Sequence, residues 1–206
     1  RFGLSLGFGD KTVKEVCEMN NVDCQTFLVV VNFMAEGFSR MDGSADDISI
    51  PALVDYLRQA HIYFLDYCLP AIRRKLIEAI DCSQDDVSFL ILKFFDGYMR
   101  EVRKHMEYEE KTVFKYVDTL IHGNAPKNYQ ISTFSKHHDQ VGERLTELKN
   151  IIIKYCPAKA NTNVLNAALF DIYACEEGLE SHCKVEDYLF VPAILKLERR
   201  MRENEK

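Results

Sequence analysis

Six potential metal ligands occur in this sequence as two copies of one spacing. A histidine is followed 44 residues later by a second histidine, and four residues after that by a glutamate. A spacing of four residues places two side chains on one face of an α-helix. The repeat therefore requires several helices that present ligands to one another, and it predicts a metal pair held between them. The ligands are His61, His105 and Glu109 and, 77 residues further on, His138, His182 and Glu186.

The apolar periodicity predicts an all-α fold. Alternating apolar runs bounded by turn residues, which would indicate strands, are nearly absent. Long amphipathic helices with short connections favour an up-down-up-down four-helix bundle. Pro70 and Pro192 lie inside helical patterns, where proline removes a backbone hydrogen bond and disturbs the helix. The patterns run from about residue 51 to 80, from 85 to 122, from 132 to 155, and from 162 into the charged C-terminal tail.

A smaller helical module is predicted in front of the bundle. Asp10 or Thr12 can cap its first helix, and Asp23 can cap its second. A polar, glycine-bearing stretch follows and is typical of a linker. The sequence thus predicts an N-terminal module at residues 1–38, a linker at 39–48 and the bundle at 49–206.

Composition excludes several classes of protein. A net charge of −6 and an isoelectric point near 5.6 argue against a nucleic-acid partner, which needs a basic face. The sequence has no apolar run of about 18 residues, so no membrane span is expected. Seven cysteines without a Cys-x-x-Cys motif do not form a secreted disulfide framework. Reduced thiols in the cytoplasm are the expectation.

The six ligands favour iron over structural zinc. Each His–Glu pair can bind one ion through its imidazole while its carboxylate bridges two ions. Four neutral nitrogen donors and two anionic bridges suit two first-row metal ions, with open positions left for water or a small ligand. Burying these groups in a bundle core without metal would be costly.

Neighbouring histidines are rivals that the spacing separates. His137 lies about 100° away from His138 on a helix, and the 44-residue spacing selects His138. His122 is followed by Gly123 at a predicted helix end, where an imidazole complements the helix dipole.

Three segments resemble a known family. The sequences HMEYEE, HHDQVG and SHCKVEDYLFVP are similar to the hemerythrin-like di-iron domain, in particular the branch called RIC, for repair of iron centres. The resemblance covers roughly residues 50–200. It implies a non-haem di-iron centre, oxo- or hydroxo-bridged, with the six residues above as ligands. His61 is the least well matched, because family members often carry adjacent histidines on this helix.

The sequence also departs from related patterns. Oxygen-carrying hemerythrins have a fifth histidine where this chain has Gly142, and in their last helix an aspartate lies at the offset of Asp187. The 77-residue repeat favours Glu186 over Asp187. Residues 11–33 resemble the ScdA-type domain that precedes the di-iron domain in RIC proteins. That domain carries Cys-Cys-Gly-Gly where this chain has Leu-Gly-Phe-Gly at residues 6–9.

The resemblance implies a cytoplasmic protein that repairs iron–sulfur clusters under nitrosative or oxidative stress, by supplying iron or by handling nitric oxide. Damaged iron–sulfur proteins are then the expected partners, O2 or NO the expected small ligands, and a homodimer stays open. The alternative is a hemerythrin-like protein that binds or senses O2, NO or redox state. A di-iron oxidase is disfavoured, because bundle oxidases use four carboxylate ligands.

Overall fold

Most of the chain that the structure describes is helical. The computed structural model describes residues 1–36, 48–80, 86–124, 129–136, 141–156 and 160–204, and these ranges contain no β-strand. None of their helices is long and apolar enough to span a lipid bilayer. The all-α prediction is confirmed for these residues, and the up-and-down order of the helices stays a prediction.

The two N-terminal helices begin where capping side chains predict. Thr12 and Glu15 form a reciprocal capping box at the start of α1 (Val13–Met19). The Asp23 carboxylate accepts a backbone N–H from the first turn of α2 (Cys24–Glu36) at 2.7 Å. Of the two candidate caps for the first helix, the structure therefore selects the threonine.

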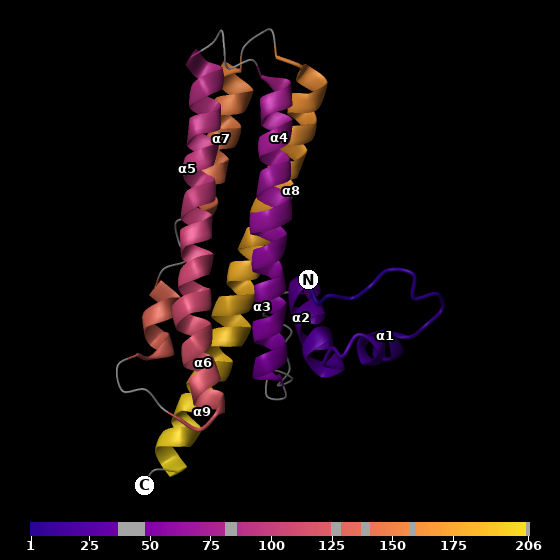
Figure 1. Ribbon diagram of the computed structural model, residues 1–206, viewed down its shortest axis with the longest axis vertical. Helices are drawn as coiled ribbons and strands as arrows, with labels where there is room; N and C mark the ends of the chain where they lie inside the picture. The colour runs from indigo at the N-terminus through magenta and orange to yellow at the C-terminus, as the bar shows by residue number, and fades with distance from the viewer. Residues whose placement is uncertain (37–47, 81–85, 125–128, 137–140, 157–159, 205–206) are drawn as a thin grey trace. The chain divides into compact units, whose positions relative to one another are not determined.

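None of the four predicted long helices is purely α-helical in the structure. Three contain a π-turn, which holds one more residue than an α-turn. The third begins as a 3-10 helix, and the 137–140 segment that follows lies outside the described residues. The elements are α3 (Ile50–Ile62), π-turn η3 (Tyr63–Cys68) and α4 (Leu69–Ala79); α5 (Asp86–Tyr108), π-turn η4 (Glu109–Val113) and α6 (Phe114–Ile121); 3-10 helix η5 (Ile131–Lys136) and α7 (Val141–Tyr155); α8 (Thr162–Val185), π-turn η6 (Glu186–Phe190) and α9 (Val191–Asn204) (Figure 1).

The chain divides into two compact units, and each is made of separate stretches of sequence. The first unit comprises Arg1–Ala60, Glu109–Lys136 and Ser181–Lys206, and the second comprises His61–Tyr108 and His137–Glu180. Three of the four divisions in the sequence fall inside α3, at the junction of α5 with η4, and inside α8.

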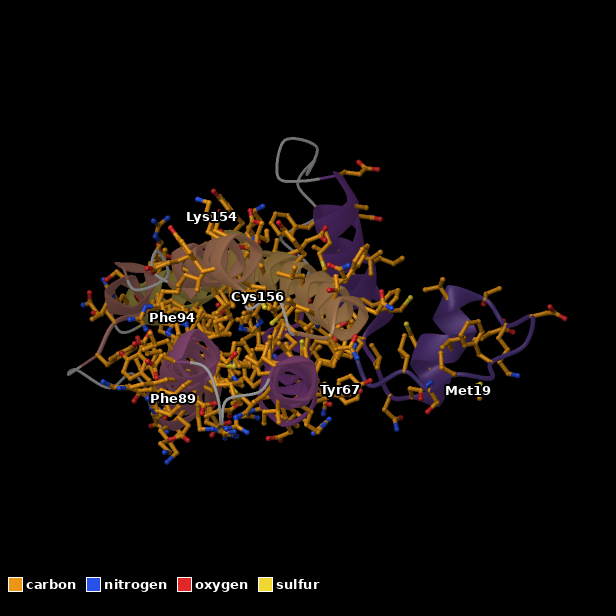
Figure 2. The ribbon with its side chains drawn as sticks, turned by 90° about the horizontal axis from the view of Figure 1, so that it is seen from above. Met19, Tyr67, Phe89, Phe94, Lys154 and Cys156 are labelled. Carbon is orange, nitrogen blue, oxygen red and sulfur yellow. The ribbon has the colours of Figure 1, made fainter. Side chains whose placement is uncertain are left out.

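In the second unit, four helices form a closed ring. Helix α5 packs against both α4 and α7. Lys75 of α4 pairs with Asp171 of α8 at 2.6 Å, and Lys149 of α7 pairs with Glu176 of α8. Figure 2 looks along these helices, with Phe89 marking an exposed side of α5. The ring is the arrangement expected of a helical bundle.

The core of the first unit includes the second N-terminal helix, α2. Val29, Val30 and Phe33 of α2 belong to one apolar cluster with side chains of α3, η4, α6, η5, η6 and α9. The Phe33 and Tyr188 ring centroids lie 6.1 Å apart. The predicted boundary between module and bundle stays a prediction, and residues 39–47 of the predicted linker lie outside the described ranges.

A buried carboxylate links three elements of this unit. Tyr116 of α6 donates its hydroxyl proton to Glu198 Oε1 of α9 at 2.6 Å, and the Ile131 N–H of η5 donates to the same oxygen at 3.0 Å. Glu198 is 6% exposed. Burial raises the pKa of the Tyr116 hydroxyl, and its hydrogen bond with Glu198 adds to the increase, so the phenol stays protonated at neutral pH.

Two of the π-turns are explained by prolines. The Leu69 N–H reaches back five residues to the Phe64 carbonyl, and the next residue is Pro70. Val191 likewise bonds to Glu186, and the next residue is Pro192. A proline ring collides with the carbonyl four residues before it in an α-helix. The wider π-turn accommodates the proline ring. The disturbance that Pro70 and Pro192 were predicted to cause in their helices therefore takes the form of a π-turn.

Lys115 is exposed and is the second residue after η4, as Pro70 is after η3 and Pro192 is after η6. Replacing Lys115 by proline is therefore expected to change the free energy of unfolding by less than about 1 kcal/mol. The control is Asp118→Pro, also exposed but inside α6, which should cost about 3 kcal/mol. Urea denaturation measures both. Equal losses for the two variants would contradict this account of the π-turns.

Candidate metal centre

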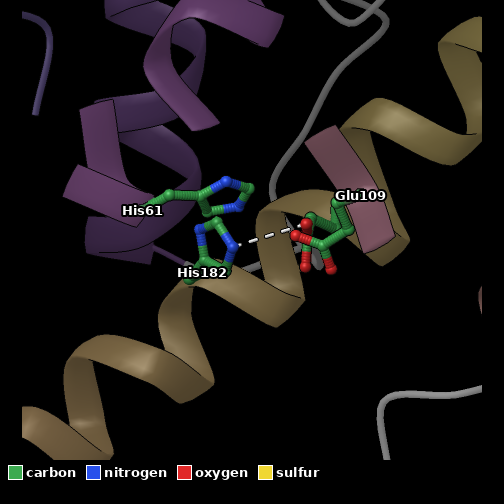
Figure 3. A group of neighbouring side chains, drawn as sticks. His61, Glu109 and His182 are labelled. Carbon is green, nitrogen blue, oxygen red and sulfur yellow. Dashed lines mark ion pairs between the residues drawn. The ribbon is translucent and has the colours of Figure 1, made fainter. Parts of the chain in front are cut away.

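Four of the six predicted ligands lie together. Ligand atoms of His61, Glu109, His182 and Glu186 are all within 4.8 Å of one another. His61 lies near the end of α3. Figure 3 shows His61, Glu109 and His182 turned toward one another. The group thus collects side chains from three stretches of sequence.

Local helix geometry delivers each ligand. His182 and Glu186 are four residues apart, on one face of the continuous helix formed by α8 and η6, and His182 Nε2 lies 3.4 Å from Glu186 Oε1. Glu109 is the first residue of η4, as Glu186 is the first residue of η6. His61 is the last residue but one of α3 before η3.

All four side chains are removed from solvent. Glu109 and Glu186 are 0% exposed, His182 is 1% exposed and His61 is 3% exposed. A pair of buried carboxylates repels and is poorly solvated, so such a group needs protons or cations to balance its charge. Two imidazoles and two carboxylates at this separation are the donor set of a first-row metal ion, and the residues therefore fit a metal.

Burial raises the pKa of Glu186 well above its usual range, and the nearby carboxylates of Glu109 and Asp187 raise it further. Without a metal, Glu186 thus holds a proton under conditions in which an exposed glutamate is ionised. Metal ligands must lose their protons, so metal binding at this position is coupled to proton release.

The adjacent thiol does not complete the ligand set. Burial raises the pKa of Cys183, and the carboxylates of Glu186 and Glu109 raise it further. A metal-binding cysteine must be a thiolate. Cys183 is not among the four residues whose ligand atoms lie within 4.8 Å of one another, so this group offers only nitrogen and oxygen atoms.

The other two predicted ligands are not in this group. His105 lies on α5, one helical turn before Glu109, and is half-buried. His138 and its rival His137 lie outside the described residues, so their roles stay predictions. Asp187 is half-buried and is not in the group either, whereas Glu186 is. Gly142 lies in α7, and its surroundings are not described.

Sequence reasoning missed the π-turns at the ligands. Glu109 and Glu186 each begin a π-turn, and His61 precedes one by two residues. π-Bulges occur frequently at functional sites. Pro70 and Pro192 were a signal for two of the three, but nothing comparable follows Glu109.

His122, predicted to cap a helix, is the residue at which α6 ends. Its Nδ1 lies 2.8 Å from the Asp118 carbonyl, and Gly123 follows with a positive φ of 81°. This histidine is exposed and lies apart from the buried ligands. The predicted position of His122 at a helix end is confirmed.

Residues 52–194 match the family model described as the Hemerythrin HHE cation binding domain. The match includes all six residues of the repeated pattern. The chain matches none of the curated proteins with which it was compared.

Proposed function

Because the chain belongs to the hemerythrin HHE cation-binding domain family, we propose that it is a non-haem di-iron protein of the iron–sulfur cluster repair type. The observation that carries the proposal is the buried group of two imidazoles and two carboxylates. His105 and His138 would complete the ligand set for a second ion. Damaged iron–sulfur proteins would be the acceptors of iron, and NO or O2 the small ligands.

The four residues would have two distinct roles in such a site. His61 and His182 would hold the metal through imidazole nitrogens, and Glu109 and Glu186 would hold it through carboxylate oxygens and balance its charge. Iron would provide redox activity and affinity for small diatomic ligands. The proton that Glu186 holds without metal gives the protein a way to favour iron release in acid, since protons and metal compete for the same carboxylate.

Protein purified without air is expected to contain two iron ions per chain and to transfer iron to an apo iron–sulfur protein. His182→Ala should lose at least one ion and most of the transfer, because it removes a buried ligand. His122→Ala, an exposed histidine in the same domain, should match the wild type. Metal analysis and the absorbance of the rebuilt cluster measure the two effects.

Two outcomes would contradict parts of this proposal. Zinc as the bound metal, or no metal, would exclude the di-iron centre. Two tightly held irons with reversible O2 or NO binding and no transfer would instead favour the sensor that the sequence leaves as its alternative.

A further inference from the structure

The π-turn η4 has no proline to account for it. Within the described residues, a proline is the second residue after η3 and after η6. After η4 the two residues are Phe114 and Lys115. Glu109, the first residue of η4, is fully buried among the candidate ligands. Some other interaction has to favour the widened turn at this position.

Arg58 contacts both ends of η4. Its Nε lies 3.3 Å from Oε2 of Glu110, the second residue of the turn. Its guanidinium carbon lies 5.5 Å from the ring centroid of Phe114, the first residue after the turn. Arg58 is three residues before His61 on α3, so the two side chains project from neighbouring positions on that helix.

The register of η4 determines where Glu109 points. A π-turn adds one residue, and one residue corresponds to about 100° of rotation in an α-helix. The helix after the turn is fixed, because Phe114, Val117 and Leu120 are buried in the core. If η4 became an ordinary α-turn, the helix before it would rotate and carry Glu109 away from His182 and Glu186.

We propose that Arg58 is a positioning residue that holds η4 in its widened form and thereby keeps Glu109 at the metal centre. This inference rests on the proposed metal-binding function. Arg58 acts through geometry more than through stability, since an ion pair with 44% and 36% exposed side chains contributes little to folding. Supporting partners of ligands nevertheless change metal affinity by about 10- to 100-fold.

The test titrates the full chain with Fe2+ under nitrogen. Arg58→Gln is expected to weaken binding about 10-fold or more, without shifting the urea midpoint of the metal-free protein. The control is Arg73→Gln, which removes a similarly exposed arginine paired with Asp96 at 2.6 Å and should leave affinity unchanged. In metal-free Arg58→Gln, amide hydrogen exchange should accelerate at residues 109–114.

A rescue variant separates positioning from general damage. Adding Lys115→Pro to Arg58→Gln should restore most of the affinity and slow the exchange at 109–114, because proline favours a π-turn at this position as at Pro70 and Pro192. If the wild type binds iron and Arg58→Gln binds it with the same affinity, the role of Arg58 is overturned but the proposed function is not. Wild type that binds no metal would overturn the proposed function and this inference with it. An affinity loss that the proline fails to restore also counts against positioning through η4.

Discussion

Replacing Glu186 by glutamine should make the metal-free protein more stable while weakening its affinity for metal. Burial raises the pKa of Glu186, so the folded state binds a proton that the unfolded state has lost once the pH passes the ordinary glutamate range. Stability therefore falls as the pH rises from that range toward the raised pKa. Glutamine has no proton to lose. At pH 8 we expect the free energy of unfolding of metal-free Glu186→Gln to exceed that of the wild type by on the order of 1–3 kcal/mol.

Binding of metal should make the wild type more stable than Glu186→Gln, the reverse of their order without metal. A ligand present at 100 times its dissociation constant stabilises a folded protein by about 2.7 kcal/mol. The wild type should show a stabilisation of this size with Fe2+ under nitrogen, and Glu186→Gln should lose most of it because one anionic ligand is gone. Urea denaturation at pH 8, with and without iron, measures both signs.

The matched control is Glu177→Gln, which changes an exposed carboxylate on α8, the helix that leads into η6. It should leave stability unchanged in both conditions. A metal-free Glu186→Gln protein that is less stable than the wild type at pH 8 would contradict the expected cost of this carboxylate.

The second large effect concerns the pair that joins α7 to α8. Lys149 has a side chain 9% exposed, and it pairs with Glu176, whose side chain is 21% exposed. Thr146 donates its hydroxyl proton to Glu176 at 2.7 Å, and Lys149 Nζ lies 4.1 Å from the Tyr173 ring centroid. Replacing Glu176 by leucine leaves a buried ammonium without its counter-charge, which should cost about 3–5 kcal/mol.

The double variant should recover most of that loss. Lys149→Met with Glu176→Leu replaces the ion pair by an apolar contact, which is often neutral or stabilising. We expect it within about 1 kcal/mol of the wild type by urea denaturation. Single changes in the exposed pair of Arg144 and Glu101 serve as controls and should each cost less than about 1 kcal/mol. A double variant as unstable as Glu176→Leu would mean that the loss comes from packing and not from charge.

Helix limits were predictable wherever a local signal sets them. Thr12 and Asp23 cap their helices through side chains within three residues of the N–H groups they accept from. Gly123, with its positive φ, marks the end of α6. The repeat of 44 and 77 residues predicted six ligands, and ligand atoms of four of them lie within 4.8 Å of one another.

What the sequence did not predict depends on distant partners or on a single extra residue. The sequence predicts an α-helix from residue 132, yet η5 is a 3-10 helix whose first N–H bonds to Glu198, 67 residues later. Apolar periodicity does not detect one added residue, so η4 was invisible. Arg58, which contacts Glu110 in this turn, lies 52 residues earlier in the sequence.

The division of the first unit into three stretches of sequence has a consequence for biosynthesis. Its last stretch begins at Ser181, so the apolar side chains of α2 have no complete core while the earlier part of the chain is being made. The buried group spans His61 to Glu186, and two of its four members, His182 and Glu186, belong to this last stretch. A nascent chain therefore lacks two of these four ligands until residues 182–186 have been made, so the buried group cannot assemble on the earlier part of the chain.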